Sequence, residues 1–380
     1  MTGPIGIGQL GAGFIGQVHS LSYRLAAMAR HRVPAGIRLV SLADTDAALR
    51  REVADRYGWE TVTDDWRSIV DDPDVRLFVN AGPNALHGAP SIAAARNGKH
   101  VLCEKPLART ADEAFDTYRR VETTGVLHQC AFMYRFIPAI RHAHELIAAG
   151  ELGEVLHFRS RFLMSFALDQ GLPMSWRLDK AAAGAGALGD LGSHHIDLAR
   201  FLVAEPVAVA AHAQTFIHDR PGGRVSNDDS FAAIARLANG ATASFEASRV
   251  AGGHGLSSRI EIDGTRGSLL FDLERLNELS VSLAGAQGFR TFLVTAPEHP
   301  WADFLFPVGV QGQHPIGWEV CFAHQAQTML RAIDSGERLP DTAPTFRDGY
   351  RVAEVVDSID RAAGSGSWEP VTYREVDRQA

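Results

Sequence analysis

The chain has 380 residues, of which 46% are hydrophobic and 22% charged, and its formal net charge is −8. This length predicts two domains with a substantial core, and the composition is typical of a globular protein. The negative charge argues against nucleic acid or an anionic membrane surface as a partner, and no segment approaches the ~18 apolar residues of a membrane span. The three cysteines lack paired spacing and a strand begins by Ile5, too early for a signal peptide, so we expect reduced thiols in the cytoplasm.

The first predicted element is a buried strand that turns into a helix through a Gly-x-Gly-x-x-Gly sequence. Gly11 permits the tight turn, Gly13 lets the main chain approach a pyrophosphate, and Gly16 lets the helix pack closely on the strand. The helix opens with Phe14 and Ile15, and its free N–H groups and dipole favour phosphate binding. These residues predict a dinucleotide-binding site.

The second predicted strand, residues 37–43, ends at Asp44. A carboxylate at this position accepts hydrogen bonds from the adenosine ribose hydroxyls of a dinucleotide. A 2′-phosphate would meet Asp44 and Asp46, with no arginine or lysine in the immediate turn, so NAD is favoured over NADP. The alternative role of Asp44, a helix N-cap, is compatible with ribose binding.

Strand and helix patterns continue to alternate as far as residue 131. We expect helices at residues 46–57, 64–70, 85–97 and from the capping box Thr110-x-x-Glu113, and strands at residues 75–79, 100–103 and 127–131. Such alternation predicts a parallel sheet with helices on both faces. Residues 1–131 are therefore expected to form a Rossmann dinucleotide-binding domain of the α/β class.

The pattern then changes to short alternating strands. The expected elements are strands at residues 156–162, 230–234, 242–246 and 268–271, an irregular stretch at 285–317, and helices at 318–333 and 347–362. Asn239-Gly240 predicts a two-residue hairpin, and Asp263-Gly264 predicts another turn. Residues 132–380 are thus expected to form an α+β domain with a large, mostly antiparallel, open-faced sheet.

Glu104-Lys105-Pro106 follows a predicted strand, at the carboxyl edge of the sheet where cofactors and substrates bind. Only three of the 37 lysine and arginine residues are lysines. Lysine can exchange a proton where a guanidinium stays charged, so we predict that Lys105 takes part in proton transfer. The alternative is a surface lysine before a turn.

Asp190, His194 and Asp197 are spaced by four and three residues, which predicts one face of a helix. A carboxylate one turn from an imidazole can orient it for general acid or base chemistry near neutral pH. His195 points elsewhere and is expected to be packed, although it is also a candidate partner for a substrate hydroxyl. A metal site built from these residues is the alternative, but adjacent histidines on a helix diverge and no third well-spaced ligand follows, so no metal is predicted.

Taken together, these motifs resemble those of a known protein family along the whole length of the chain. The chain resembles the glucose–fructose oxidoreductase / inositol dehydrogenase / MocA (Gfo/Idh/MocA) family in its glycine turn, its Glu-Lys-Pro strand end and its later Asp-x-x-x-His. The resemblance implies a catalytic group of Lys105, Asp190 and His194, and a homo-oligomer, dimer or tetramer, formed through the open sheet. The cofactor residues that it implies beside the glycine turn are Pro83, Asn84, His87, Glu104 and Lys105.

Some local stretches narrow the expected substrate. Residues 65–69, 175–177, 184–190 and 346–350 resemble members of the family that act on levoglucosan-like anhydrosugars. The resemblance departs at Phe136, where such a member carries arginine. Trp301 is a further candidate for an aromatic wall of the pocket. The predicted substrate residues are Lys105, Tyr134, Arg135, Trp176, Arg177, Asp190 and His194.

We therefore expect an NAD-dependent oxidoreductase of carbohydrate metabolism that oxidises a secondary ring hydroxyl of a neutral sugar, such as an anhydrosugar, a glycoside or a free hexose. The hydride goes to the nicotinamide and the proton to Lys105 or His194, which remain alternatives for the immediate base. Clustered cations that would suit a sugar phosphate do not accompany these motifs. An inositol dehydrogenase acting on a cyclitol is one alternative. A dinucleotide-binding regulator is the other, but it would not need the Lys105, Asp190 and His194 set.

Overall fold

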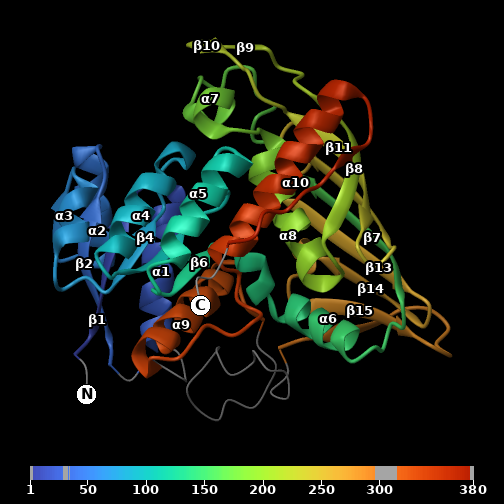
Figure 1. Cartoon of the computed structure of the whole chain (residues 1–380), viewed down its shortest axis with the longest axis horizontal. Coiled ribbons are helices and arrows are strands. Elements are labelled where there is room, and N and C mark those ends of the chain that lie inside the picture. The colour runs from blue at the N-terminus through green and yellow to red at the C-terminus, as the bar shows by residue number, and fades with distance from the viewer. Residues whose placement is uncertain (1–2, 29–32, 34, 296–314, 377–380) are drawn as a thin grey trace.

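In the computed structural model, which describes residues 3–28, 33, 35–295 and 315–376, the N-terminal part alternates strands with helices (Figure 1). Its elements are β1 (Ile5–Leu10), α1 (Phe14–Met28), β2 (Ile37–Ala43), α2 (Ala47–Tyr57), β3 (Thr61–Thr63), α3 (Trp66–Asp71), β4 (Leu77–Asn80), α4 (Gly88–Arg96), β5 (His100–Cys103), α5 (Ala111–Glu122) and β6 (His128–Cys130). All neighbouring strands are parallel, in the order β3-β2-β1-β4-β5-β6. The predicted Rossmann sheet is confirmed.

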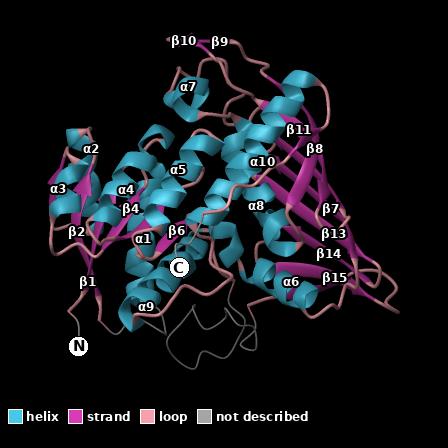
Figure 2. Ribbon diagram, viewed as in Figure 1, coloured by secondary structure: helices cyan, strands magenta, loops and turns pink. Residues whose placement is uncertain are grey.

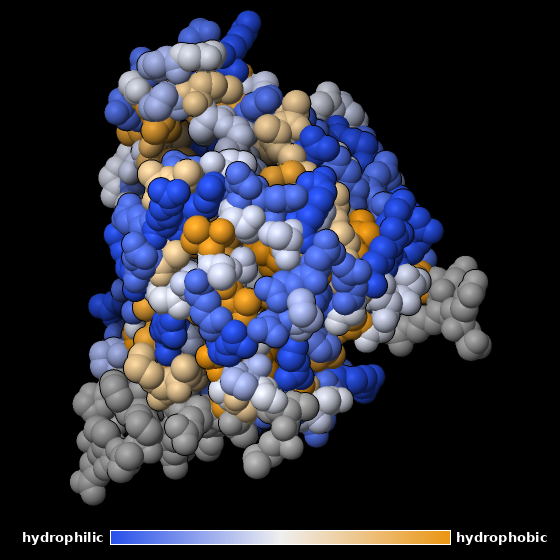
Figure 3. Space-filling view, turned by 90° about the vertical axis from the view of Figure 1, so that its left-hand side faces the viewer, coloured by the Kyte–Doolittle hydropathy of each residue, from blue (hydrophilic) through white to orange (hydrophobic). Residues whose placement is uncertain are grey.

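Local sequence explains these elements. Every residue of β1 and β4 is buried, as expected for parallel strands covered on both faces. Asp46 caps α2 by accepting hydrogen bonds from two main-chain N–H groups, and Gly58 ends the helix with a φ of 73°. The short strand β3 was not predicted, because three partly exposed residues give no usable pattern. Viewed from the side of this domain, the surface is mostly hydrophilic and its apolar patches are small and separated (Figure 3).

The remaining chain forms a large sheet with helices on one face (Figure 2). Its elements are α6 (Pro138–Ala148), β7 (Val155–Leu163), α7 (Lys180–Ala183), α8 (Ser193–Leu202), β8 (Pro206–Gln214), β9 (Asp219–Arg220), β10 (Gly223–Arg224), β11 (Ser230–Leu237), β12 (Thr242–Ser248), β13 (Ser257–Gly264), β14 (Gly267–Asp272), β15 (Glu278–Leu283), β16 (Arg290–Leu293), α9 (Glu319–Ser335), α10 (Phe346–Ser365) and β17 (Glu369–Pro370). The strand order is β16-β15-β14-β13-β7-β12-β11-β8-β17. Only β7 and β12 are parallel among these described pairs, so the sheet is mixed but mostly antiparallel.

The two faces of this sheet differ. In β11, Phe231, Ala233 and Ala235 are buried, whereas the alternating side chains of Ala232 and Ile234 are exposed. The buried face packs against α6, α8 and α10, and the other face is open, as predicted (Figure 2). None of the described helices is long and apolar enough to cross a membrane.

Two details of the second domain differ from the predictions. A hairpin does form at Asn239-Gly240, where Gly240 has a φ of 90°, but four residues, 238–241, separate β11 from β12. The stretch expected to be irregular contains β16, whose four exposed residues pair with the edge of the sheet. Exposure on both faces removes the apolar alternation that would have predicted a strand.

Helix α9 belongs by its packing to the first domain, although the expected boundary at residue 131 assigns it to the second. Ala326, Met329, Leu330 and Ile333 lie in the same hydrophobic core as β1, and α9 packs along α1. Helix α10 then packs on β8 of the second domain and on α5 of the first. The two domains are therefore linked by several chain crossings as well as by contacts.

Candidate active site

A cavity of ≈ 800 Å³ separates the carboxyl ends of the parallel strands from the second domain. This edge is where ligands bind in doubly wound folds. Of the residues predicted to bind cofactor or substrate, those that line the cavity are Gly11, Gly13, Phe14, Ile15, Asp44, Pro83, Asn84, His87, Glu104, Lys105, Tyr134, Trp176, Arg177, Asp190 and His194. The structure thus brings together most of the predicted set.

The glycine turn has the shape that a dinucleotide requires. Gly11 has a φ of +100°, and a Cβ atom there would lie 2.3 Å from the Ala81 carbonyl oxygen. A Cβ at Gly16 would lie 2.1 Å from the Gly11 carbonyl oxygen, so close packing excludes any side chain. A Cβ at Gly13 would meet no atom within 4 Å, because that main chain faces the open cavity. These residues fit a pyrophosphate at the N-terminus of α1.

Asp44 ties the end of β2 to this turn. Its Oδ2 accepts a hydrogen bond from the Ala12 N–H at 2.7 Å, and its Oδ1 accepts one from the Asp46 N–H at 2.9 Å. The structure also brings Arg50 close, which the sequence did not indicate: its Nη1 donates to the Asp44 carbonyl oxygen at 2.8 Å. Arg50 is thus bound to the main chain, and the carboxylates of Asp44 and Asp46 lie close together just after β2.

Glu104 is held by a partner that the sequence analysis missed. Its Oε1 lies 2.8 Å from Nε2 of His19, a buried residue of α1, and its Oε2 accepts a hydrogen bond from the Lys105 N–H at 3.1 Å. His19 follows Gly16 by three residues, which places it one helical turn further into α1. In the sequence, only this position, one helical turn after the glycine turn, could have indicated a role for His19. Glu104 therefore fixes the main chain from which Lys105 extends.

Lys105 joins the two domains. Its Nζ donates to the carbonyl oxygen and to Oδ1 of Asp190, both at 2.8 Å. Burial by itself would raise the pKa of Asp190, but the Lys105 ammonium and its hydrogen bond hold that pKa below its usual range. The carboxylate is therefore ionised at neutral pH and the ion pair is intact.

His194 lies next to this pair on α8. Its ring packs on Tyr134, with centroids 4.6 Å apart, and its buried Nδ1 has no hydrogen-bond partner among the described residues. Burial, and then the nearby Lys105 charge, lower its pKa well below 6.5. The imidazole is consequently neutral near pH 7 and can accept a proton.

The predicted helix face that joins Asp190, His194 and Asp197 is wrong. Asp190 lies in η4 (Leu188–Gly192), a π-helical turn in which the Ser193 N–H donates to the Leu188 carbonyl oxygen, so α-helical spacing does not apply. Asp190 binds Lys105 instead of orienting His194. Asp197 points into the core, where burial raises its pKa although Arg135 opposes that shift.

The prediction that Arg135 contacts substrate is also corrected. Its guanidinium is buried and donates to both carboxylate oxygens of Asp197, at 2.8 and 2.5 Å, and to Oδ1 of Asp348 at 2.9 Å. A guanidinium with these partners is a core ion pair. Phe136, where the resemblance departs, is likewise fully buried and lies under the Arg141 guanidinium, outside the cavity lining.

The other predicted residues have defined places. His87 Nδ1 lies 2.7 Å from the Pro106 carbonyl oxygen and its Nε2 lies 3.0 Å from that of Gly82, so it links two cofactor-side loops. The Arg177 guanidinium lies over the Trp176 ring, 4.4 Å from its centroid. His195 is packed, as expected, with Nε2 2.7 Å from the Ser258 hydroxyl, and it does not line the cavity. Trp301 lies outside the described residues.

Sequence reasoning did not assign a group of apolar lining residues to the site. They are Phe162, Met164, Phe166, Leu256, Leu273, Trp318 and Phe322. Trp318 stacks on Phe14 at the cavity wall. These residues come from strand ends, loops and the first turn of α9, with no shared motif, so only the fold assembles them. No group of three or more His, Cys, Asp or Glu residues suited to a metal occurs in the described part of the chain.

Comparison with known proteins agrees with this geometry. Residues 5–132 match the oxidoreductase family with an NAD-binding Rossmann fold, and residues 140–270 match the GFO/IDH/MocA C-terminal domain. Fold and site thus define an oxidoreductase with a nicotinamide-dinucleotide domain. The chain belongs to the Gfo/Idh/MocA family.

Two relatives and one solved structure illustrate the similarity. Levoglucosan dehydrogenase from Pseudarthrobacter phenanthrenivorans is 40% identical over 97% of this chain and 98% of its own. Inositol 2-dehydrogenase from Rhizobium meliloti is 29% identical over 93% of this chain and 96% of its own. Among solved structures, levoglucosan dehydrogenase in complex with NADH and levoglucosan has a TM-score of 0.91 at 41% identity, covering 97% of this chain and 99% of that one.

The carboxylates at the end of β2 predict the cofactor preference. NAD should be used at least about tenfold more efficiently than NADP, a difference of ~1.4 kcal/mol, because Asp44 and Asp46 repel a 2′-phosphate. Asp44→Asn should narrow the ratio of kcat/KM values for the two cofactors, whereas Asp360→Asn, at an exposed position of α10, should leave that ratio unchanged. Equal use of both cofactors by the native protein would contradict this assignment of Asp44.

The neutral state of His194 predicts the pH dependence. The value of kcat/KM should fall on acidification with a midpoint below pH 6.5, because His194 accepts no proton once it is protonated and its pKa is lowered. Lys105→Met removes a neighbouring cation and so raises the pKa of His194. The midpoint of the acid limb of the remaining activity should therefore move to a higher pH. A pH–rate profile measures both. A midpoint at or above 6.5 in the native protein would show that His194 does not set this limb.

Proposed function

We propose that this protein oxidises a secondary ring hydroxyl of a neutral sugar to a keto sugar with NAD⁺, and that its preferred substrate is a levoglucosan-like anhydrosugar. The observation that carries the proposal is the Lys105–Asp190 ion pair beside the neutral His194, in a cavity shared with the glycine turn. Similarity to levoglucosan dehydrogenase over 97% of the chain supports the choice of sugar.

The residues divide the work as follows. NAD⁺, when its pyrophosphate and adenosine ribose are bound along Gly11, Gly13 and Asp44, would supply the nicotinamide ring as the hydride acceptor. Two N–H groups of the Lys105 ammonium are engaged by Asp190, and the third is free to donate to the substrate hydroxyl oxygen. That contact stabilises negative charge on the oxygen as the proton leaves. His194 is neutral and takes the proton.

The cavity lining supports a neutral ring. Aromatic faces such as those of Tyr134, Trp176 and Trp318 pack well on sugar C–H groups. Within the described lining, the lysine and arginine side chains are Lys105 and Arg177, and Lys105 is already paired. A phosphate would need several free donors, so an unphosphorylated sugar is preferred.

Inositol oxidation is the second candidate, because two inositol dehydrogenases are among the relatives. The same Lys105, Asp190 and His194 would act on a cyclitol hydroxyl. A non-catalytic regulator is disfavoured, since an ion pair poised for proton transfer has no use there.

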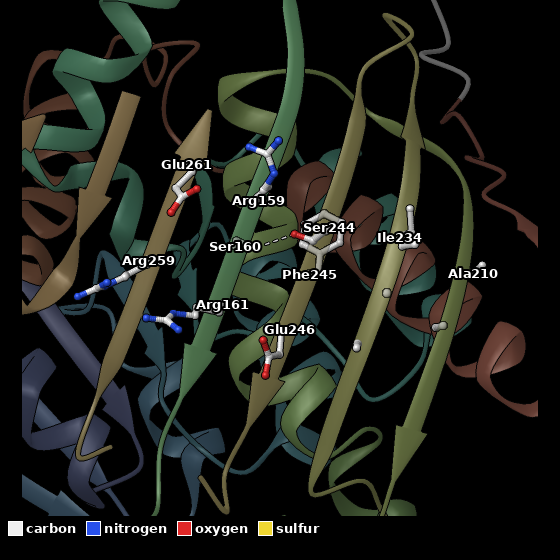
Figure 4. A pocket seen from close by; sticks show the side chains of 13 residues that line it. Arg159, Ser160, Arg161, Ala210, Ile234, Ser244, Phe245, Glu246, Arg259 and Glu261 are labelled. Carbon is white, nitrogen blue, oxygen red and sulfur yellow. Dashed lines mark hydrogen bonds between the residues drawn. The ribbon is translucent and has the colours of Figure 1, made fainter. Parts of the chain in front are cut away.

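We also propose that a second copy of the chain covers the open sheet face. On that face the in-register neighbours Arg159 and Glu261, and Arg161 and Glu246, lie on adjacent strands (Figure 4). Ile234 on β11 is 50% exposed there. A face that carries both signs of charge and apolar groups suits a two-fold contact with itself, in a dimer or a tetramer.

Three buried, unpaired cysteines support the expected cytoplasmic location.

A substrate panel tests the proposed function. Levoglucosan, other anhydrosugars, glycosides, free hexoses, inositols and sugar phosphates are each supplied with NAD⁺, and NADH absorbance is followed. Levoglucosan-like anhydrosugars should give the highest kcat/KM, and each phosphate should be poorer than its parent sugar. A preference for inositols would support the second candidate, and turnover only with phosphorylated sugars would overturn the assignment of the pocket. Tight NADH binding without any turnover would identify a regulator.

A further inference from the structure

The helix that carries Asp190 and His194 begins without a cap from its own sequence. Ala187, at its start, has α-helical φ and ψ and offers no side-chain acceptor. Three successive N–H groups donate instead to one residue some forty positions later, Asp228: Gly186 N to Oδ1 at 2.6 Å, Ala187 N to the carbonyl oxygen at 3.0 Å, and Leu188 N to Oδ2 at 2.8 Å. Asp228 thus satisfies N–H groups that a helix start normally leaves unpaired.

The contact between Asp228 and this turn is unusually close. A Cβ atom at Gly186 would lie 1.9 Å from the Asp228 carbonyl oxygen, so only glycine permits it. The Asp228 carboxylate also lies at the positive end of the helix dipole, where negative charge is favourable. The residue two positions before β11 therefore fixes the position of η4, and with it the position of the Asp190 carboxylate that binds Lys105.

The neighbours of Asp228 hold a second part of the cavity lining, at Arg177. Asn227 Nδ2 donates to the Arg177 carbonyl oxygen at 2.8 Å, and Arg249 Nη1 donates to the same oxygen at 3.3 Å. Arg249 is itself held by Asn227 Oδ1 at 2.8 Å and Asp229 Oδ1 at 2.9 Å. Asn227, Asp229 and Arg249 are all at most 3% exposed, so this network is shielded from water.

We propose that residues 227–229 form a positioning segment that sets two parts of the active-site lining, Asp228 through the catalytic helix and Asn227 through the Arg177 main chain. The inference rests on the proposed function for its kinetic consequences, but not for its structural ones. Two adjacent side chains then control different parameters. Asp228 governs how Asp190 meets Lys105 and hence kcat, whereas Asn227 governs the Trp176-Arg177 wall and hence the KM of the sugar.

Kinetics of Asp228→Ala, Asp228→Asn and Asn227→Ala, with the best substrate of the panel, test this division. Asp228→Ala should lower kcat by about 10², the loss expected from a misplaced catalytic group, with little change in the sugar KM. Asp228→Asn retains one acceptor, so its kcat should lie between those of the native protein and Asp228→Ala. Asn227→Ala should raise the sugar KM about tenfold while kcat changes little, as for lost uniform binding. The control Asp65→Ala removes a helix cap from the remote α3 and should change neither parameter.

A second readout needs no substrate. The chain has three lysines, Lys99, Lys105 and Lys180, so incorporation of carbon-13 lysine gives three sets of side-chain Cε NMR signals without modifying the ammonium groups, and Lys105→Arg identifies the signal of Lys105. Asp228→Ala should shift the Lys105 signal and leave that of Lys99 in place, with NADH binding by fluorescence retained.

Native kcat together with a native Lys105 signal in Asp228→Ala would overturn the proposal. So would a lowered kcat at unchanged KM in Asn227→Ala. If the sugar panel fails altogether, the NMR comparison still decides whether Asp228 positions Asp190, so the two failures are distinguishable.

Discussion

The Lys105 side chain crosses from the N-terminal domain to the second domain and donates to both the carbonyl oxygen and the carboxylate of Asp190. Hydrogen bonds of this length tolerate little movement, so the pair requires one relative position of the two domains. Each side of the pair is supported separately. Glu104, held by His19, fixes the Lys105 main chain, and Asp228 caps the turn that carries Asp190. The geometry of the active site thus depends on His19 and Asp228, two residues that do not line it.

Buried charges away from the active site also stabilise the position of helix α8, which carries His194. Arg135 links Asp197 on α8 to Asp348 on α10, and both carboxylates are largely withdrawn from water. Removing one member of such a buried pair lowers the free energy of unfolding by about 3–5 kcal/mol, because the other charge is left unpaired. Helix α9 returns to the core of the first domain before α10 completes the second. The relative position of the two domains is therefore fixed both by the chain crossing between them and by the packing of α9 in the core of the first domain.

Much of this could be predicted from sequence, because the main signals are local. The glycine turn, Asp44 and Glu104-Lys105 each lie at the end of a buried strand, and parallel strand ends meet at one edge. Periodicity likewise predicted the two closing helices. Periodicity could not predict that α9 packs on α1, because an apolar helix face shows that the helix is buried but not which element it contacts. The π-helical turn at Asp190 removed the expected contact with His194. Arg135 is a residue type that often binds substrate, but in the fold it forms a buried ion pair. Asp228 and His19 act through contacts between distant segments, which no spacing rule encodes.

A double-mutant cycle on Lys105 and Asp190 tests most directly whether the pair across the domains acts as one unit. The kcat/KM values of Lys105→Met, Asp190→Asn and the double variant are compared with that of the native protein at saturating NAD⁺, after NADH binding has shown each variant to be folded. If each residue works through the other, the double variant should be about as impaired as the poorer single variant, so that the losses are far from multiplicative. Losses that multiply would show that Lys105 and Asp190 contribute independently, and would contradict the central role given to their ion pair.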